Sequence, residues 1–263
     1  MSIRTFAEDL YVHRLVRHLT HIPTHVAIIQ DGNRRYAKAH GKDTAFGHRA
    51  GAETTFKVLE WMEGLGISHV TFYAFSTENF KRPKEEVQEL LELFLEKFTE
   101  MLADKRLFEG EVNVTIIGDR SLINKQLLEK IEAVEEATKN HNKYFLHLAL
   151  AYGGRNEIVE TTKCIVSKVR AGEISPDSIT PDFVTKRMYP TVDMPPVDLI
   201  IRTANDKRTS NFLPWLANGN EAAVCFCAPP WPEFRYVDLV RALRTYDERM
   251  KAESASSTSA SFF

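Results

Sequence analysis

Short apolar runs alternate with longer amphipathic stretches along most of the chain. The runs are rich in valine, isoleucine, leucine and phenylalanine, which is typical of buried strands, and the stretches between them have the apolar periodicity of a helix face. We expect strands at 26–30, 70–75, 112–117, 144–151, 197–201 and 221–226, and helices at 2–20, 49–63, 83–103, 121–139, 154–170 and 236–252. Strands that alternate with helices predict an α/β fold with a mostly parallel central sheet flanked by helices.

Glycine and proline mark several of the expected helix ends. Gly64 and Gly66 end the amphipathic stretch at 49–63, and Pro83 opens a long helix. Proline is favourable at a first helical position because its missing N–H would have no partner there. By themselves, the apolar residues on one face of that helix predict ordinary core: Val87, Leu90, Leu91, Phe94, Leu95 and Phe98.

The 263 residues contain no internal repeat and no linker rich in glycine and serine. A single domain over residues 1–252, with residues 1–20 as its N-terminal helix, is therefore the better interpretation. The remaining segment, 253–263, is a low-complexity stretch that we expect to be a disordered tail.

Composition excludes several classes of protein. The formal net charge of -2 argues against nucleic acid as the main partner, because such domains usually carry a basic excess. The apolar runs fall short of a membrane span, and the polar N-terminus lacks the apolar core of a signal peptide. Three cysteines give no disulfide framework and fit a reducing, cytoplasmic location. Cys225 and Cys227 would share one face of a strand, where a metal site is the alternative to plain core.

Polar residues with distinct chemistry gather directly after the first strand, at 30–36. Asp31 can hold Mg2+ through its oxygens, and Gly32 lets the backbone approach a ligand closely. The guanidinium groups of Arg34 and Arg35 suit a diphosphate. A polar turn with surface arginines is the alternative.

Two later strand ends are also polar. Hydroxyls, an amide and an arginine gather at 76–83, although such a sequence is common before helices. At 198–211, Arg202 ends an apolar strand and Arg208 and Ser210 follow, which makes either a second phosphate-binding loop or a charged surface loop. Ligands of parallel α/β sheets bind beyond the carboxyl ends of the strands. Three anion-binding strand ends in one sheet therefore predict a phosphate ester or diphosphate substrate, and ordinary nucleotide-binding loops are absent from the sequence.

Six motifs follow one another from His25 to Phe234: HVAIIQDGNRRYAKAHGKDTAFGHRAG, YAFSTENFKRP, IIGD, AYGGRNEI, IRTANDKRTSNFLPW and WPEF. This series resembles the undecaprenyl diphosphate synthase family of cis-prenyltransferases. The resemblance implies an α/β sheet whose helices enclose a hydrophobic tunnel. It also implies an Mg2+-dependent transferase that adds isopentenyl diphosphate to an allylic prenyl diphosphate, giving a polyprenyl diphosphate that is the precursor of a glycosyl carrier lipid. The DDxxD motif of the all-helical trans-prenyltransferases is absent.

The same resemblance assigns roles to individual residues. Asp31 and Glu221 become Mg2+ ligands, Asp31 and Asn79 become catalytic, and the inner face of 83–103 lines the tunnel. The resemblance implies that the allylic diphosphate is bound by Gly32, Asn33, Arg34, Arg35 and His48, and that the allylic chain lies next to Tyr36. Isopentenyl diphosphate would be bound by Arg202, Arg208, Thr209 and Ser210. The rest of the substrate-binding set is Ser76, Thr77, Glu78, Phe80, Arg82 and Thr44, the last at a position where the family has arginine.

The implied reaction begins when Mg2+ and arginines neutralise the departing diphosphate. The isopentenyl double bond then attacks the allylic carbon, and loss of a proton leaves a new cis double bond. The family associates Asn79 with proton acceptance. Because a carboxamide is a poor base, we expect Asn79 to position the proton for a diphosphate oxygen or a water. His48 is the competing candidate, since the ordinary pKa of histidine suits the task.

The chain departs from the family pattern in places that affect substrate detail. Asn205 and Asp206 replace the usual Gly-Glu pair, and the segment after Glu221 is longer than the common form. The NGNEAAV sequence resembles archaeal members, for which geranylgeranyl diphosphate is the expected primer. Prenyl transfer to an alcohol or a sugar stays open as an alternative. Retention of the metal and phosphate residues argues against a non-catalytic accessory subunit.

Family members are usually dimers, and we expect a homodimer. Many members carry an Arg-X-Gly near the C-terminus that reaches the partner's phosphate site, whereas this chain has Arg249, Met250 and Lys251 there. The alternative is the catalytic subunit of a heteromer. Release of a long lipid product further implies transient association with a membrane.

Overall fold

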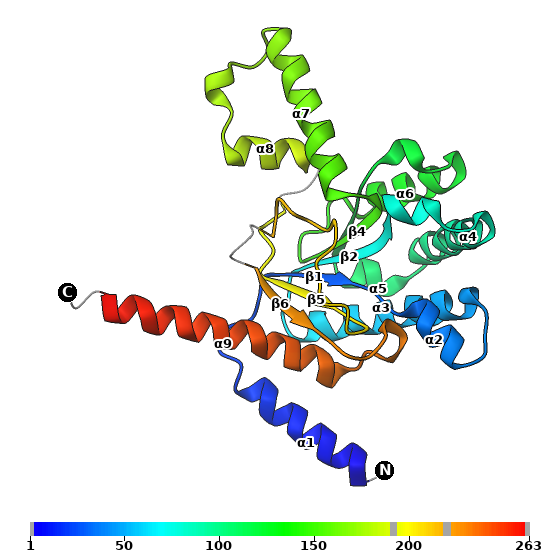
Figure 1. The fold of residues 1–263 in the computed structure, drawn as a ribbon, viewed down its shortest axis with the longest axis vertical. Coiled ribbons are helices and arrows are strands. Elements are labelled where there is room, and N and C mark those ends of the chain that lie inside the picture. The colour runs from blue at the N-terminus through cyan, green and yellow to red at the C-terminus, as the bar shows by residue number, and fades with distance from the viewer. Residues whose placement is uncertain (1–2, 190–193, 218–221, 261–263) are drawn as a thin grey trace. The chain divides into compact units, whose positions relative to one another are not determined.

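The computed structural model describes residues 3–189, 194–217 and 222–260. The chain divides into two compact units, the first made of Met1–Ser68, Val197–Arg208 and Glu221–Phe263 and the second of His69–Pro196 and Thr209–Asn220. Each unit has parallel strands with helices beside them (Figure 1), which confirms the predicted α/β class with a parallel sheet flanked by helices. The single domain over 1–252 stays a prediction.

In the first unit, three parallel strands run in the order β1-β5-β6. β1 and β5 are buried along their whole length, as expected for parallel strands with nearly continuous apolar sequences. The register pairs Ile29 with Arg202 and Arg202 with Phe226, so the three strands end at one edge. The elements of this unit are α1 (Ile3–Arg17), β1 (His25–Ile29), α2 (Asn33–Ala39), α3 (Thr44–Gly64), β5 (Leu199–Arg202), β6 (Ala223–Phe226), η4 (Trp231–Glu233) and α9 (Tyr236–Ala260).

The N-terminal helix of this unit is held to the C-terminal helix. Val12 of α1 belongs to a buried cluster with Val237 and Val240 of α9. Just after α1, the backbone N–H groups of Thr20 and His21 donate to one carboxylate oxygen of Asp247 on α9, at 3.2 and 3.0 Å. Asp247 is 2% exposed, so these bonds compensate a buried charge and fix the start of the chain against α9.

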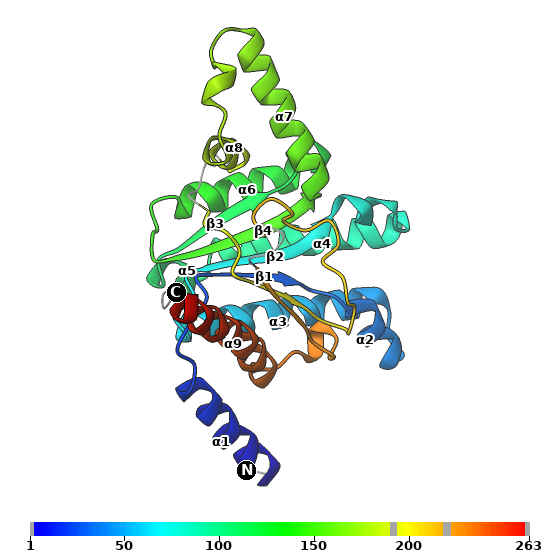
Figure 2. The ribbon, with the colours of Figure 1, turned by 60° about the vertical axis from the view of Figure 1, so that its left-hand side comes forward.

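In the second unit, three parallel strands run in the order β3-β4-β2, with α6 against β3 and α4 (Figure 2). α6 buries Leu127, Ile131 and Val134, which lie at helical spacing on one face, and Asn124 caps its first turn. The elements of this unit are β2 (His69–Ser76), η1 (Thr77–Lys81), α4 (Lys84–Met101), α5 (Lys105–Glu109), β3 (Val112–Ile117), η2 (Arg120–Leu122), α6 (Lys125–Thr138), β4 (Tyr144–Tyr152), α7 (Gly154–Arg170), η3 (Pro176–Ser178) and α8 (Pro181–Met188).

Several helices differ from the expected ones. α2, α5 and α8 were not predicted, because helices of 7, 5 and 8 residues are too short for apolar periodicity to be recognised. α3 begins at Thr44 rather than near residue 49, since the side chain of Asp43 accepts from the N–H of Phe46 at 2.9 Å and caps the first turn.

The last helix, α9, continues to Ala260, through residues expected to be disordered. The Arg249 Nε donates to Glu253 at 2.7 Å, an i,i+4 pair that supports the helix in this region. Although α9 has 25 residues, neither it nor another helix of the described ranges combines the length and the apolar character that crossing a membrane requires.

Candidate active site

The chain turns sharply after β1, and Gly32 makes this turn possible. Its φ of 107° lies in a region that side chains disfavour. A Cβ built on Gly32 would lie 2.6 Å from Cβ of Pro230 and 2.9 Å from Cβ of Ala204. The loop after β1 therefore packs closely against Ala204 in the loop after β5 and against Pro230 before η4.

Asp31 and Arg202 form an ion pair at this edge of the sheet. Oδ2 of Asp31 accepts from Nε of Arg202 at 2.9 Å and from Nη2 at 2.5 Å. A third donor, Nη1, binds the backbone oxygen of Arg208 at 2.6 Å. The Arg202 side chain is 4% exposed and that of Asp31 is 35% exposed. A buried guanidinium is costly unless paired, so Asp31 stabilises Arg202 while its carboxylate still reaches solvent.

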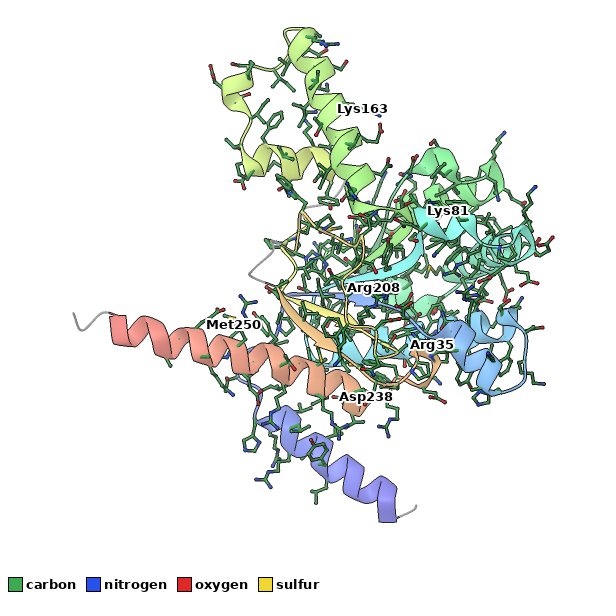
Figure 3. The ribbon with its side chains drawn as sticks, viewed as in Figure 1. Arg35, Lys81, Lys163, Arg208, Asp238 and Met250 are labelled. Carbon is green, nitrogen blue, oxygen red and sulfur yellow. The ribbon has the colours of Figure 1, made fainter. Side chains whose placement is uncertain are left out.

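Asp206 connects two exposed arginines beside this pair. Nη2 of Arg35 donates to Asp206 Oδ2 at 2.9 Å, and Nη1 donates to the backbone oxygen of Ala204 at 2.8 Å. Nη1 of Arg208 is 3.3 Å from Asp206 Oδ1. Both side chains are more than half exposed, Arg35 on α2 and Arg208 in the loop after β5 (Figure 3). Guanidinium groups in this arrangement suit an anion with several oxygens, such as a diphosphate.

Two glycines explain how α2 is placed. Gly47 and Gly51 are four residues apart on α3, and both face Asn33 at the start of α2. A Cβ at Gly47 would collide with the backbone oxygen of Asn33, and a Cβ at Gly51 would lie 2.5 Å from its Oδ1. That Oδ1 is buried and has no hydrogen-bond partner within the described residues. The AFGHRAG motif therefore serves close packing of α3 on the helix that carries Arg34 and Arg35.

Three further predicted residues lie on α2 and α3. The Tyr36 ring stacks on that of Phe46, with centroids 5.9 Å apart. His48 is buried on α3, with 7% of its surface exposed, and Thr44 is the first residue of α3. The first unit thus carries all the described residues to which the resemblance assigns the allylic substrate.

In the second unit, the turn after β2 is closed by Asn79. Oδ1 of Asn79 accepts from the backbone N–H of Ser76 at 3.0 Å, which caps η1. The Nη1 of Arg82 donates to Glu86 at 3.0 Å, and Glu86 is 7% exposed. Because the amide oxygen of Asn79 already accepts a hydrogen bond, its role in this structure is to hold the turn.

Asn211 ties the same turn to the start of α7, and sequence reasoning did not single it out. Its Nδ2 donates to Glu78 Oε1 at 3.1 Å, and its Oδ1 accepts from the N–H of Arg155 at 2.9 Å. A Cβ at Gly153 would lie 2.7 Å from Oγ1 of Thr77, so the glycine of AYGG allows this approach. Burial tends to raise the pKa of Glu78, but hydrogen bonds, that from Asn211 included, bring it below the ordinary value.

Three of the remaining predicted residues lie in the second unit. Phe80 packs edge-on against Phe75, with centroids 4.8 Å apart. Thr209 and Ser210 are exposed, and Ser210 has a φ of 55°. Glu221, the second expected metal ligand, lies outside the described residues.

The Asp31 carboxylate can hold Mg2+ only if substrate oxygens complete the coordination of the ion. Both bonds from Arg202 end on Oδ2 of Asp31, and the carboxylate is partly exposed. Within the described ranges, no three His, Cys, Asp or Glu side chains are grouped to hold a metal by themselves. Magnesium is commonly held by one or two carboxylates together with waters and substrate phosphates, and Asp31 is suited to this kind of binding.

A half-open cavity of about 650 Å³ in the second unit is lined by a half-buried acid, Glu157, that sequence reasoning missed. Glu157 Oε2, on the first turn of α7, accepts from the hydroxyls of Tyr152 at 2.6 Å and Tyr189 at 2.9 Å. Burial raises the pKa of Glu157 to about 7, although the two phenolic hydrogen bonds oppose this rise. No spacing in the sequence signals the cluster, because Tyr189 is 32 residues from Glu157.

Glu157 should make stability depend on pH in a defined window. The folded state keeps a proton on Glu157 up to a pKa of about 7, whereas the unfolded state releases it near the ordinary value of 4.5. The stabilising contribution is therefore complete below about pH 4.5 and is lost as the pH rises through about 7. Since one pKa unit corresponds to about 1.4 kcal/mol, the change is on the order of 3 kcal/mol.

Glu157→Gln, which cannot titrate, should gain stability relative to the native sequence by that amount between about pH 4.5 and pH 8. Urea unfolding at several pH values measures this difference. Glu160→Gln is the control, because Glu160 lies one turn away on α7 and its salt bridge with Lys163 is exposed. If the free energy of unfolding depended on pH in the same way for the native protein and for Glu157→Gln, the raised pKa of Glu157 would be contradicted.

Comparison with known proteins gives a consistent set of relatives. The family described as "Putative undecaprenyl diphosphate synthase" matches residues 29–253. The chain is 49% identical over 230 residues to "Tritrans,polycis-undecaprenyl-diphosphate synthase (geranylgeranyl-diphosphate specific)" of Methanosarcina mazei, covering 87% of this chain and 77% of that protein. It is 45% identical over 243 residues to the protein of the same name from Halobacterium salinarum, covering 92% and 80%.

Solved structures agree with these relatives. Lavandulyl diphosphate synthase from Lavandula x intermedia, in complex with dimethylallyl diphosphate, has a TM-score of 0.80 and 32% identity, covering 86% of this chain and 95% of that one. A probable undecaprenyl diphosphate synthase from Campylobacter jejuni has a TM-score of 0.68 and 29% identity, covering 86% and 96%.

Proposed function

The chain belongs to the undecaprenyl diphosphate synthase family of cis-prenyltransferases, and we propose that it lengthens geranylgeranyl diphosphate by repeated addition of isopentenyl diphosphate. The motif resemblance and its archaeal character are confirmed by the relatives from Methanosarcina mazei and Halobacterium salinarum. Their names specify geranylgeranyl diphosphate, which supports it as the primer. The product would be a long polyprenyl diphosphate, the precursor of a glycosyl carrier lipid.

One observation carries the site assignment: the Asp31–Arg202 pair, with the exposed Arg35 and Arg208 beside it. A carboxylate for Mg2+ and guanidinium groups for phosphate oxygens meet at one sheet edge. We assign the allylic diphosphate to Gly32, Asn33, Arg34, Arg35 and His48, and isopentenyl diphosphate to Arg202, Arg208, Thr209 and Ser210. We keep Ser76, Thr77, Glu78, Phe80, Arg82, Tyr36 and Thr44 as substrate-binding residues on the same resemblance.

The family is generally Mg2+-dependent, and Asp31, with Glu221, would hold the ion. Bound Mg2+ neutralises charge on the departing diphosphate. Arg35 contributes to the same neutralisation, because a guanidinium already oriented by Asp206 and Ala204 needs little reorganisation when the allylic C–O bond breaks.

After the new C–C bond forms, one proton must leave the isopentenyl unit. The Asn79 oxygen is engaged by the N–H of Ser76, which supports a positioning role for this amide rather than proton acceptance. A diphosphate oxygen, a water or the buried His48 would take the proton.

The proposal is tested by incubating the protein with labelled isopentenyl diphosphate and, in turn, dimethylallyl, farnesyl or geranylgeranyl diphosphate. Chromatography should show the longest products and the highest turnover with geranylgeranyl diphosphate. Equal use of all three primers would contradict the primer assignment, and transfer only to an added alcohol or sugar would contradict chain elongation.

The tunnel is proposed along the partly buried face of α4. Leu91 and Leu95 are half-buried there, whereas Leu90 and Leu93 are fully buried. Leu91→Trp and Leu95→Trp should shorten the product, because added volume in a packed tunnel is not absorbed freely. Product length by chromatography is the measurement.

Glu92→Trp provides the control for bulk, since Glu92 is exposed on the same helix and should leave product length unchanged. If both leucine variants fold and give the native product distribution, this face of α4 is ordinary core.

We propose a homodimer as the assembly, with a cytoplasmic location, as both were expected from the sequence. Lys251 stands where many members have glycine, and here its Nζ donates to Asp247 at 2.6 Å and to the backbone oxygen of His18 at 3.3 Å. Lys251 thus makes hydrogen bonds within its own chain. Light scattering with activity measured on the same fractions should show active dimers. A chain that is inactive until a second, related subunit is added would establish the heteromer instead.

A further inference from the structure

Two cysteines lie side by side at the end of β6. Cys225 is in the strand and Cys227 directly follows it, so their side chains point to one face. Their sulfur atoms are 4.0 Å apart. Cys227 is 8% exposed and Cys225 is half-buried, while Cys164, on α7, is exposed and distant in sequence.

The backbone of Cys227 holds the loop after β5. Its N–H donates to the oxygen of Arg202 at 2.7 Å, and its own oxygen accepts from the N–H of Asn205 at 2.9 Å. Ala204 and Asn205 have φ values of 64° and 55°, a conformation that is uncommon in residues other than glycine and that the bonds of Cys227 help to hold. A displacement of Cys227 would therefore be transmitted to Arg202 at the end of β5 and to the loop after it, which carries Asp206.

The two thiols are unequal. A hydrogen bond from Cys227 lowers the pKa of Cys225 to about 7, against the effect of burial. The same hydrogen bond, burial and the negative charge of Asp238 at the start of α9 (Figure 3) raise the pKa of Cys227. Cys225 is thus the nucleophile, and Cys227 keeps its proton for a second step.

We propose that Cys225 and Cys227 form an oxidisable dithiol, and that its disulfide form displaces Arg202 and the loop after β5 and so lowers the proposed prenyl transfer. The Cys225 thiolate attacks a hydroperoxide, the O–O bond breaks, and the departing oxygen leaves as water or an alcohol after taking a proton. The sulfur of Cys227 then attacks the sulfenic acid on Cys225, and its hydroxyl leaves with the Cys227 proton as water as the S–S bond forms. The two thiols lose two electrons, and the hydroperoxide gains them.

Formation of the bond requires movement. The sulfur atoms must approach from 4.0 Å to about 2 Å. Residues two apart in an extended strand have Cα atoms about 6.6 Å apart, near the upper end of what disulfides usually span. The backbone at Cys227 must therefore shift towards Cys225, which stretches its hydrogen bonds to Arg202 and Asn205.

The test treats the whole protein with hydrogen peroxide and then digests it with trypsin. The peptide 209–235 contains both cysteines and lacks Cys164. It should lose the mass of two hydrogens and regain them with a dithiol reductant. Activity should fall about tenfold or more and return on reduction, because misplacing a binding group by about an ångström costs up to about a hundredfold.

Cys164→Ser should behave like the native protein, whereas Cys225→Ser and Cys227→Ala should keep their activity in peroxide. The mass measurement does not depend on the proposed substrate, so it separates failure of the dithiol from failure of the proposed function. Overoxidation of Cys225 without loss of two hydrogens, or an equal loss of activity in Cys225→Ser, would overturn the proposal.

Discussion

Asp31→Asn should reduce prenyl transfer by roughly a thousandfold or more, since weakening Mg2+ at a departing diphosphate costs several kcal/mol of transition-state stabilisation. Asp31→Asn should lose less stability than Asp31→Ala, because the amide oxygen can still accept from the buried guanidinium of Arg202 although it no longer balances its charge. Asp31→Ala should lose activity to the same extent and also stability, by about 3 kcal/mol or more, because it leaves that buried charge without its partner.

Turnover at saturating Mg2+ and urea unfolding of both variants separate these effects. Asp182→Asn, at an exposed carboxylate on α8, is the matched control and should retain full activity. A folded Asp31→Asn with near-native turnover would remove Asp31 from the metal site.

Burial explains which parts of the fold could be predicted. β3 was expected at 112–117 and has those bounds, and β1 lies within one residue of its expected position. Both could be predicted because the sequences of buried parallel strands are continuous apolar runs. Besides being short, α2 takes a position that could not be predicted, since it depends on contacts with Gly47 and Gly51, in a helix that begins later in the chain. The order of the strands within each unit also depends on such distant contacts.

The site was predictable as a set of residues but not as a set of pairs. Strand ends indicated Asp31 and Arg202, yet their ion pair depends on the β1–β5 register, which periodicity does not specify. Asp206 was treated only as a departure from the family pattern, whereas the structure places it between Arg35 and Arg208. The capping role of Asn79 was readable from its spacing of three after Ser76.

The structure also separates two arginines that the sequence treated alike. Arg208→Ala should raise the KM for isopentenyl diphosphate by about ten- to a hundredfold, the value of one or two charge-assisted hydrogen bonds, and should leave the KM for the primer nearly unchanged. Its side chain is 66% exposed, so stability should hardly change. Arg202→Ala should raise the same KM and in addition lower kcat and stability, because Asp31 and the backbone oxygen of Arg208 both lose their donor.

Steady-state kinetics with each substrate varied in turn, together with thermal unfolding, measure the difference between the two variants. Lys207→Ala is the control for charge, since Lys207 is exposed in the same loop and should change neither KM by more than about twofold. Arg202→Lys keeps the charge but loses the fork that spans Asp31 and the oxygen of Arg208, so it should recover stability better than activity. Equal increases in both KM values for Arg208→Ala would contradict separate sites for the two diphosphates. A stable Arg202→Ala with unchanged kcat would show that the buried pair only supports the fold.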